Sequence, residues 1–342
     1  MENAPQNLQE AQSKHKHLAK YIADSKKEYG TPDYYVKLDR SMSSIKNPNL
    51  IYPVGGPNFI HIVRKEGEGI FYNVIEPQMS DEEKKLYDKI LNHLIEVAVA
   101  LPVPHNVNKI DTVLEKLFDK LVKVSSKKPG FLQKQFTSEI PVTKEQYEKL
   151  KYFLIRDRVG YGKLEALFND PNLEDIHCTG VGNLFTIHKI FGMVTISIGF
   201  KDDVELNKYM IEVSERVERP VSDAKSIVDA MMPDGSRVNF IYGRDISQEG
   251  SSFTIRKFSK IPVSIVQLIG WGTINSQLAA YLWLCIENGI NIFVCGETAS
   301  GKTTTLNAMS TFIKPIDKVY TVENTPEVTM PQDTWQHLLT RE

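Results

Sequence analysis

The sequence predicts an α/β protein in which a hairpin with a helical bundle, and then an α+β domain, precede a strand–loop–helix unit. Three observations carry this prediction. The 342 residues are enough for two or three domains at about 150 residues each. Runs of β-branched and aromatic residues alternate with stretches whose apolar residues recur at helical spacing. Near residue 296, a short apolar run leads into a glycine-rich loop and then into a helical pattern.

Composition and charge exclude several classes of protein. Hydrophobic residues make up 41% and charged residues 25%, values that are typical of folded soluble proteins rather than disordered chains. With 41 Lys and Arg against 43 Asp and Glu, the net charge is -2. The chain therefore lacks the overall basic field that most nucleic-acid binders carry, and we expect no nucleic-acid partner.

The cysteines and the apolar runs indicate the compartment. Cys178, Cys285 and Cys295 are widely spaced within or beside apolar stretches, which predicts buried thiols in a reducing compartment rather than disulfides or a metal site. The N-terminus has no apolar signal region, and stretches such as Leu94–Val103 are shorter than the roughly 18 to 20 residues of a membrane span. We expect a cytosolic chain that is still able to dock on a membrane protein.

The first 158 residues divide into two parts. Residues 1–48 are polar and carry five lysines between Lys14 and Lys27, which predicts a flexible, partly helical arm. Residues 49–158 combine β-rich and helical patterns, with capping boxes at the start of two of the helices. The predicted elements are a hairpin of Phe59–Val63 and Ile70–Ile75, and helices that follow Ser80–Glu83, cover Ile110–Leu121 and follow Thr143–Gln146.

Residues 159–258 read as a second domain of the α+β class, built on an antiparallel sheet. One amphipathic helix, with apolar residues from Val204 to Val213, interrupts a series of short strands. The predicted strands are Leu184–His188, Val194–Ile198, Ser226–Ala230, Arg237–Tyr242 and Phe253–Arg256. Residues 259–264, which include a proline, are the expected linker to the last part of the chain.

From residue 265 the pattern changes again. A helix with apolar residues from Leu278 to Cys285 ends near Gly289, and Asn291–Cys295 has the continuous apolar character of a buried parallel strand. A second helix, with apolar residues from Leu306 to Ile313, comes after the loop that ends this strand. The order of strand, glycine-rich loop and helix is the context that a phosphate-binding loop requires.

The loop itself matches G-x-x-x-x-G-K-[ST] at every fixed position. Glycines allow the tight turn that points backbone N–H groups at phosphates, and the helix N-terminus adds partial positive charge. We expect Lys302 to reach the β- and γ-phosphates, the Thr303 hydroxyl to bind Mg²⁺, and Thr304 to contact the α-phosphate. The expected nucleotide-binding residues are Gly296, Glu297, Thr298, Ala299, Ser300, Gly301, Lys302, Thr303 and Thr304. The alternative is a glycine-rich loop that binds no nucleotide.

The surroundings of the loop narrow the class of nucleotide chemistry. No D-x-x-G follows Thr303, which argues against a GTPase, and the long segment before the loop favours a motor or assembly ATPase over a small-molecule kinase. Lys318–Val322 predicts a second buried strand, and Glu323 stands at its carboxyl end, where it can orient a water against the γ-phosphate. The alternative for Glu323 is a structural one, in which it caps a turn before Pro326.

Several segments taken together resemble the secretion ATPase superfamily of type II and type IV secretion, pilus assembly and the archaeal flagellum. The resemblance is closest to the archaeal flagellar (archaellum) motor ATPase and its archaeal pilus relatives. It covers about residues 145–342, and its co-linear order makes it more specific than the phosphate loop alone. The segments that carry it are Gly162–Asp170, Leu173–Ile176, Pro233–Gly243, Thr254–Phe258, Phe293–Asn307 and Val322–Glu327.

The resemblance implies a RecA-like P-loop core, incomplete in this chain, behind an α+β sensor-like domain, assembled as a homo-hexamer. It also implies that arginines of the preceding domain reach the phosphates, and the matching positions are Arg237 and Arg256. Each lies on a predicted strand, where an exposed arginine can equally hold a surface carboxylate. Glu323 and Glu327 match the acidic box of the family, although position 324 is Asn where many relatives carry Asp.

The expected function is that of a motor ATPase that hydrolyses Mg²⁺-ATP. It would drive assembly or rotation of an archaeal surface filament, at the inner face of the membrane, by acting on a membrane platform protein with other cytosolic motor components. The Walker B carboxylate and histidine box expected downstream are missing, so residues 265–342 are expected to be only the start of the ATPase domain. Two alternatives stay open: a nucleotide-gated scaffold without turnover, and an ATPase of another pilus, secretion or DNA-processing system.

Overall fold

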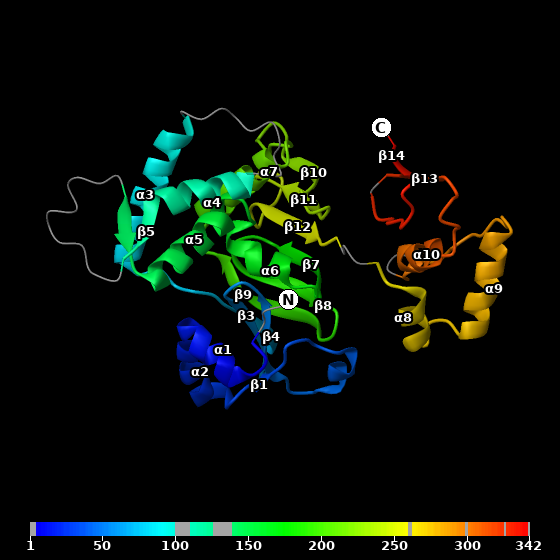
Figure 1. Cartoon of the computed structure of the whole chain (residues 1–342), viewed down its shortest axis with the longest axis horizontal. Helices are drawn as coiled ribbons and strands as arrows, with labels where there is room; N and C mark the ends of the chain where they lie inside the picture. The colour runs from blue at the N-terminus through cyan, green and yellow to red at the C-terminus, as the bar shows by residue number, and fades with distance from the viewer. Residues whose placement is uncertain are drawn as a thin grey trace. The chain divides into compact units, whose positions relative to one another are not determined.

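The chain divides into two units, seen in Figure 1. The computed structural model describes residues 5–99, 110–125, 139–258, 262–297, 300–324 and 326–340. Unit 1 comprises Met1–Met231 and Arg237–Lys257, and unit 2 comprises Met232–Ser236 and Phe258–Glu342. The predicted linker at 259–264 comes directly after this division, and its residues 259–261 lie outside the described ranges.

Unit 1 is built on one large sheet with helices around it. Its helices are α1 (Leu8–Lys14), α2 (Lys16–Tyr29), α3 (Asp81–Val99), α4 (Ile110–Leu121), α5 (Lys144–Arg158), α6 (Glu165–Asn169) and α7 (Asp203–Arg216). Among the described residues, short 3₁₀ helices cover Arg40–Ser44 and Gly162–Leu164. Its strands are β1 (Asp33–Tyr34), β2 (Asn49–Gly55), β3 (Asn58–Lys65), β4 (Gly69–Ile75), β5 (Val122–Val124), β6 (Ile140–Val142), β7 (Leu173–Cys178), β8 (Gly182–His188), β9 (Gly192–Phe200), β10 (Ile227–Met231), β11 (Arg237–Ile241) and β12 (Ser252–Arg256).

The large sheet has ten strands in the order β1-β2-β3-β4-β9-β8-β7-β12-β11-β10. The predicted hairpin is confirmed as β3 and β4, and the predicted antiparallel sheet as β7 to β12. The two are joined because β4 pairs in parallel with β9, where Phe71 faces Thr195 and Tyr72 faces Ile196. The predicted boundary at residue 158 therefore does not separate two domains, since the sheet continues across it. β7 was not predicted as a strand.

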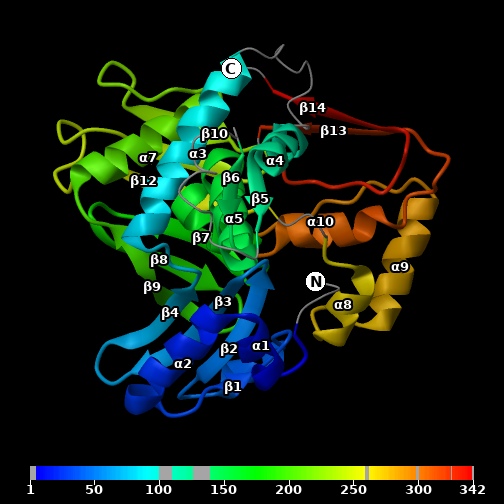
Figure 2. The same cartoon turned by 60° about the vertical axis from the view of Figure 1, so that its left-hand side comes forward.

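The N-terminal helices pack against this sheet. Ala11 and Leu18 are fully buried in a cluster with Ile51 and Phe59, and in Figure 2 α1 and α2 lie beside β1 to β3. The expectation of a flexible arm over residues 1–48 is thus wrong for α1 and α2, and residues 1–4 lie outside the described ranges. The apolar stripe of the two helices is narrow, so the lysines on their exposed side dominate the composition.

Helices α3, α4 and α5 form the predicted helical bundle around their own apolar cluster. Both predicted capping boxes are confirmed: Ser80 and Glu83 exchange bonds at the start of α3, and Thr143 and Gln146 do so at α5. The buried cluster consists of Tyr87, Ile90, Leu94, Phe118, Leu121, Val122, Val142, Leu150, Phe153 and Leu154. No helix in the described parts of the chain is both long and apolar enough to span a bilayer.

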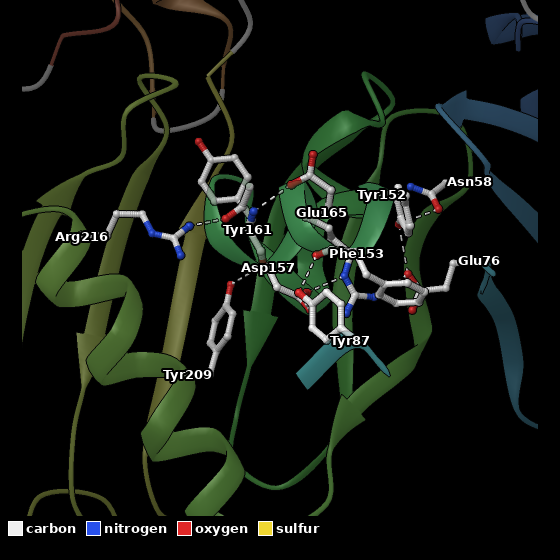
Figure 3. A network of polar contacts seen from close by, with 12 residues as sticks. Asn58, Glu76, Tyr87, Tyr152, Phe153, Asp157, Tyr161, Glu165, Tyr209 and Arg216 are labelled. Carbon is white, nitrogen blue, oxygen red and sulfur yellow. Dashed lines mark hydrogen bonds and ion pairs between the residues drawn. The ribbon is translucent and has the colours of Figure 1, made fainter. Parts of the chain in front are cut away.

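Polar contacts fix α5 to its neighbours, as Figure 3 shows. The Tyr152 hydroxyl donates to Asn58 Oδ1 at 2.9 Å and to Glu76 Oε2 at 3.2 Å, which ties the helix to the ends of β3 and β4. Just beyond α5, the Tyr161 N–H donates to Glu165 Oε2 at 2.7 Å, and Tyr161 O accepts a bond from Tyr209 of α7 at 3.4 Å. The bundle is therefore anchored both to the sheet and to α7.

A buried polar group ties β2 and β4 to the segment before β7. The Asp170 carboxylate, with no exposed surface, accepts bonds from the hydroxyls of Tyr52 at 2.6 Å and Tyr72 at 2.9 Å. His188 Nδ1 accepts the N–H groups of residues 190 and 191, so its Nε2 carries the proton and faces the Tyr52 hydroxyl at 3.3 Å. Burial lowers the pKa of His188 to about 4.

Unit 2 contains α8 (Ile265–Gly270), α9 (Ser276–Glu287), α10 (Lys302–Ser310), β13 (Val319–Glu323) and β14 (Trp335–Leu339). The strands β13 and β14 pair in parallel and form a sheet of two. The predicted strand Asn291–Cys295 is not formed, because no strand of the described residues pairs with it, and Phe293 is 87% exposed.

Burial in unit 2 differs from the prediction at two further places. Cys178 and Cys285 are buried as expected, but Cys295 is exposed, because the strand that was expected to bury it is not formed. In β13, predicted as a fully buried strand, Val319 is buried whereas Val322 is 65% exposed. The alternating burial along the strand shows that only one of its faces is covered.

Candidate functional site

The glycine-rich loop opens α10. Gly301 has φ +87°, a left-handed conformation that glycine adopts without strain, and it is the residue immediately before the helix. A side chain at Gly296 would place its Cβ 2.4 Å from Ser300 Oγ, so a larger residue here would require the Ser300 hydroxyl to move. Residues 298 and 299 lie outside the described ranges. Helix α10 directs its unpaired N–H groups toward the loop, the arrangement that binds anions.

Lys302 folds back over the loop. Its ammonium group donates to the carbonyl oxygens of Gly296 at 3.0 Å and of Glu297 at 2.6 Å. These two contacts place a positive charge over the mouth of the loop. A triphosphate is a stronger acceptor than two neutral carbonyls, so the same ammonium group is well placed to bind one.

Thr303 and Glu327 meet beside the loop. The Thr303 hydroxyl donates to Glu327 Oε2 at 3.0 Å. Asn307, one helical turn after Thr303, holds the segment that carries this carboxylate: its Nδ2 donates to Glu327 O at 3.1 Å and its Oδ1 accepts the Thr329 N–H at 3.0 Å. Glu327 is therefore fixed against α10.

Glu323, the other predicted carboxylate, has different partners. It ends β13, and its Oε1 accepts the Val328 N–H at 3.0 Å. Its Oε2 lies 2.9 Å from Nε2 of His337, a residue of β14. The Glu323 side chain is only 13% exposed, so both of its oxygens are held within unit 2.

In unit 1 the two predicted arginines are direct cross-strand neighbours. Arg237 begins β11 and Arg256 ends β12, and the register places them opposite each other with Asp175 of β7 next in the row. Arg256 Nε lies 3.9 Å from Asp175 Oδ1, and Arg237 Nη2 lies 3.6 Å from Asp229 Oδ1. Side chains of like charge directly opposite each other destabilise a sheet. An anion between the two guanidinium groups would relieve that repulsion.

The donor set beside the loop suits a small hard cation. Thr303 Oγ1 and Glu327 Oε2 are oxygen ligands of the type that Mg²⁺ takes together with phosphate oxygens and water. In the part of the chain that the structure describes, no group of three or more His, Cys, Asp and Glu residues is arranged to hold a metal ion. A magnesium ion here would therefore depend on oxygens of a bound nucleotide for most of its ligands.

The structure thus brings Lys302, Thr303 and Glu327 together, sets Glu323 beside β14, and pairs the two arginines in unit 1. Sequence reasoning missed Asn307 and His337. For Asn307 a signal was present, because it stands four residues after Thr303 on the same face of a helix. For His337 there was none, since β14 was not predicted.

Comparison with known proteins identifies one family model. The model, described as type II/IV secretion system protein, matches residues 161–338, a little more than half of the chain. The matched range contains the phosphate loop, both arginines, both glutamates and His337.

The chain is also similar to individual proteins and to solved structures. An uncharacterized protein of Methanocaldococcus jannaschii is 48% identical over 342 residues, which cover 98% of this chain and 62% of that protein. The crystal structure of the VirB11 ATPase of the Brucella suis type IV secretion system is 21% identical, with a TM-score of 0.29, over 52% of this chain and 63% of that one. The structure of the Legionella pneumophila ATPase DotB is 17% identical, with a TM-score of 0.39. The match covers 64% of this chain and 55% of that one.

Proposed function

Because the chain belongs to the type II/IV secretion system protein family, we propose that it binds and hydrolyses Mg²⁺-ATP to drive a surface filament or secretion machine. The single observation that carries this proposal is the loop before α10. There a left-handed glycine, a lysine folded over two carbonyls and a helix N-terminus lie together. We propose that unit 2 belongs to a RecA-like core and that unit 1 is the sensor-like region that precedes it in the sequence.

Each residue of the site has its own role in this proposal. Lys302 and the loop N–H groups bind the β- and γ-phosphates. By the family resemblance, Arg237 and Arg256 are the arginines proposed to stabilise the charge of the γ-phosphate. Thr303, oriented by Glu327, would be the protein ligand for Mg²⁺, and the ion would supply positive charge against the phosphates. Glu323 accepts a hydrogen bond from the attacking water. The water oxygen bonds to the γ-phosphorus as the bond to the β–γ bridging oxygen breaks, and that electron pair leaves with ADP.

The machine to which this activity belongs is an archaeal filament, either an archaellum or a type IV-like pilus. The sequence resemblance supports the assignment to a filament, and the similarity to a protein of Methanocaldococcus jannaschii supports only its archaeal source. We propose a homo-hexamer that works at the inner face of the membrane against a membrane platform protein. This chain spans 62% of that relative, so these properties belong to the proposal for the whole protein.

Removing the lysine tests nucleotide binding. Lys302→Ala deletes the cation that lies over the loop, so binding of a fluorescent ATP analogue should weaken by about 50-fold or more. Lys314→Ala, which removes an exposed lysine elsewhere in unit 2, is the matched control and should bind as the wild type does. Unchanged affinity in Lys302→Ala would show that the loop is not the nucleotide site.

Phosphate release tests turnover. Wild-type protein should release phosphate from Mg²⁺-ATP, and Glu323→Gln should lose most of that activity, because an amide is a poorer acceptor for the attacking water. Nucleotide binding without phosphate release would identify a nucleotide-gated scaffold instead. Release that depends on added DNA would identify a DNA-processing ATPase.

A further inference from the structure

Glu323 and His337 form a contact between two parallel strands. The register sets Thr321 of β13 opposite His337 of β14, and Glu323 lies two residues further along, on the same face of its strand as Thr321. His337 Nε2 reaches Glu323 Oε2 at 2.9 Å, and the two side chains are 29% and 13% exposed. The Glu323 side chain is thus mostly buried, whereas His337 lies on the solvent-exposed side of the contact.

The orientation of the imidazole ring is itself fixed by a neighbour. Trp335 lies two residues before His337 on β14, and the two rings stack with centroids 5.1 Å apart and planes inclined by 20°. The indole Nε1–H donates to Thr321 Oγ1 at 3.0 Å, which holds the tryptophan in turn. His337 is therefore directed toward Glu323 by a short chain of contacts across β13 and β14.

The Glu323 carboxylate has unused acceptor positions that can accept a hydrogen bond from a water. An ionised carboxylate only accepts hydrogen bonds, so His337 Nε2 is the donor, and the Val328 N–H donates to the other oxygen. Each carboxylate oxygen has two acceptor positions, so two remain open. Glu323 is thus held at two points and keeps the capacity to accept from a third donor.

We infer that His337 is a positioning residue for hydrolysis, which sets the Glu323 carboxylate in the orientation that aligns the attacking water. The inference rests on the proposed function, in which Glu323 performs that alignment. His337 itself contacts neither the nucleotide nor the water in this arrangement. A carboxylate fixed before the reaction starts needs little reorganisation during it, and loss of such a supporting partner commonly costs 10- to 100-fold in activity.

The test compares binding of Mg²⁺-ADP with binding of Mg²⁺-ADP-tetrafluoroaluminate, which imitates the phosphoryl group in transfer and holds the attacking water. In the wild type the second complex should bind more tightly. His337→Ala should reduce that preference by about 10-fold or more while the affinity for Mg²⁺-ADP stays within about 2-fold. His337→Gln places an amide donor near the position of Nε2 and should restore the preference to within about 3-fold.

Controls separate the inference from the proposed function. Gln336→Ala changes the adjacent residue, whose side chain lies on the other face of β14, and should behave as the wild type does. If His337→Ala keeps the full preference for the tetrafluoroaluminate complex over Mg²⁺-ADP while Glu323→Ala loses it, the inference is overturned and the proposed function stays intact. Equal loss of affinity for both complexes in His337→Ala would assign His337 a structural role and also overturn it. A wild type without any preference would overturn the proposed hydrolysis and the inference with it.

Discussion

At the scale of single residues, Glu323 and Glu327 stand four positions apart and have different partners. Glu327 accepts the Thr303 hydroxyl beside the phosphate loop, whereas Glu323 is held by His337 and the Val328 N–H. Their surroundings fit different tasks, one at the cation and the other at the attacking water. Position 324 is Asn, so Glu323 and Glu327 are the acidic side chains of residues 323–327.

The position of Glu327 leads to a prediction about magnesium. In Glu327→Gln the amide oxygen can still accept the Thr303 hydroxyl, but the negative charge beside the phosphates is gone. Without Mg²⁺ the variant should bind ATP about 5-fold more tightly, since removing one repulsive charge is worth about 1 kcal/mol. With Mg²⁺ it should bind no more tightly than the wild type. ATP titrations with Mg²⁺ and with a chelator measure the affinity of the variant relative to the wild type under each condition. The control is Glu287→Gln, which removes an exposed carboxylate on α9.

A second residue-scale prediction concerns the buried His188. Burial lowers its pKa to about 4 in the folded protein, against about 6.5 in the unfolded chain. The unfolded state therefore binds a proton first as the pH falls, and folding stability is lost between about pH 6.5 and pH 4. At pH 5 this group should cost unit 1 about 2 kcal/mol relative to pH 7.

His188→Asn isolates that contribution. Its amide oxygen can accept the N–H groups that Nδ1 accepts in the wild type, but it does not titrate. Denaturant unfolding at pH 7 and pH 5 should give a pH-dependent loss that is about 2 kcal/mol smaller in the variant than in the wild type. Equal losses in the two proteins would mean that His188 is protonated in the folded state at pH 5.

The residues of the site differ in how far the sequence could predict them. Lys302 and Thr303 could be predicted as site residues because the phosphate loop is a contiguous motif with its own local geometry. The cross-strand pairing of Arg237 with Arg256 depends on the register of two strands. The contact of Glu323 with His337 depends on a strand that has no sequence signal of its own. Long-range pairing, rather than residue type, is what the sequence left undetermined.

At the scale of elements, the sequence predicted features that depend on neighbouring residues, but it did not predict features that depend on a partner elsewhere in the chain. The capping boxes at α3 and α5 were predicted because the bonds they make lie within four residues. Asn291–Cys295 has the composition of a buried strand, but a strand exists only where another strand satisfies its backbone groups. Helix α2 shows the opposite error, because its lysines suggested an arm although Leu18 and Ile22 are buried.

Leu18 gives the test of that packing. It has no exposed surface and lies in a cluster with Ile51 and Phe59, so Leu18→Ala should destabilise unit 1 by about 2 to 5 kcal/mol. Lys20→Ala, on the exposed side of the same helix, should change stability by less than about 0.5 kcal/mol. Chemical denaturation followed by circular dichroism measures both. An effect of Leu18→Ala as small as that of Lys20→Ala would restore the interpretation of a flexible arm.

At the scale of the whole molecule, the ten-stranded sheet decides where the chain can be divided. A division at residue 158 separates β4 from β9 and removes Asp170 from the hydroxyls of Tyr52 and Tyr72. A division after Lys257 keeps all ten strands and the bundle together. The number of domains expected from chain length alone does not distinguish the two, because both give pieces of ordinary domain size.

Two fragments therefore make a decisive comparison. A chain of residues 1–257 should unfold in one cooperative transition, with near-ultraviolet circular dichroism typical of packed aromatic side chains, because every strand of the sheet keeps its partners. A chain of residues 1–158 should show no such transition, since β4 then has an open edge and two buried tyrosines lose their acceptor. Thermal scans of both fragments measure the difference. Cooperative unfolding of the shorter chain would mean that β2, β3 and β4 with the bundle form a domain of their own, as their sequence pattern first indicated.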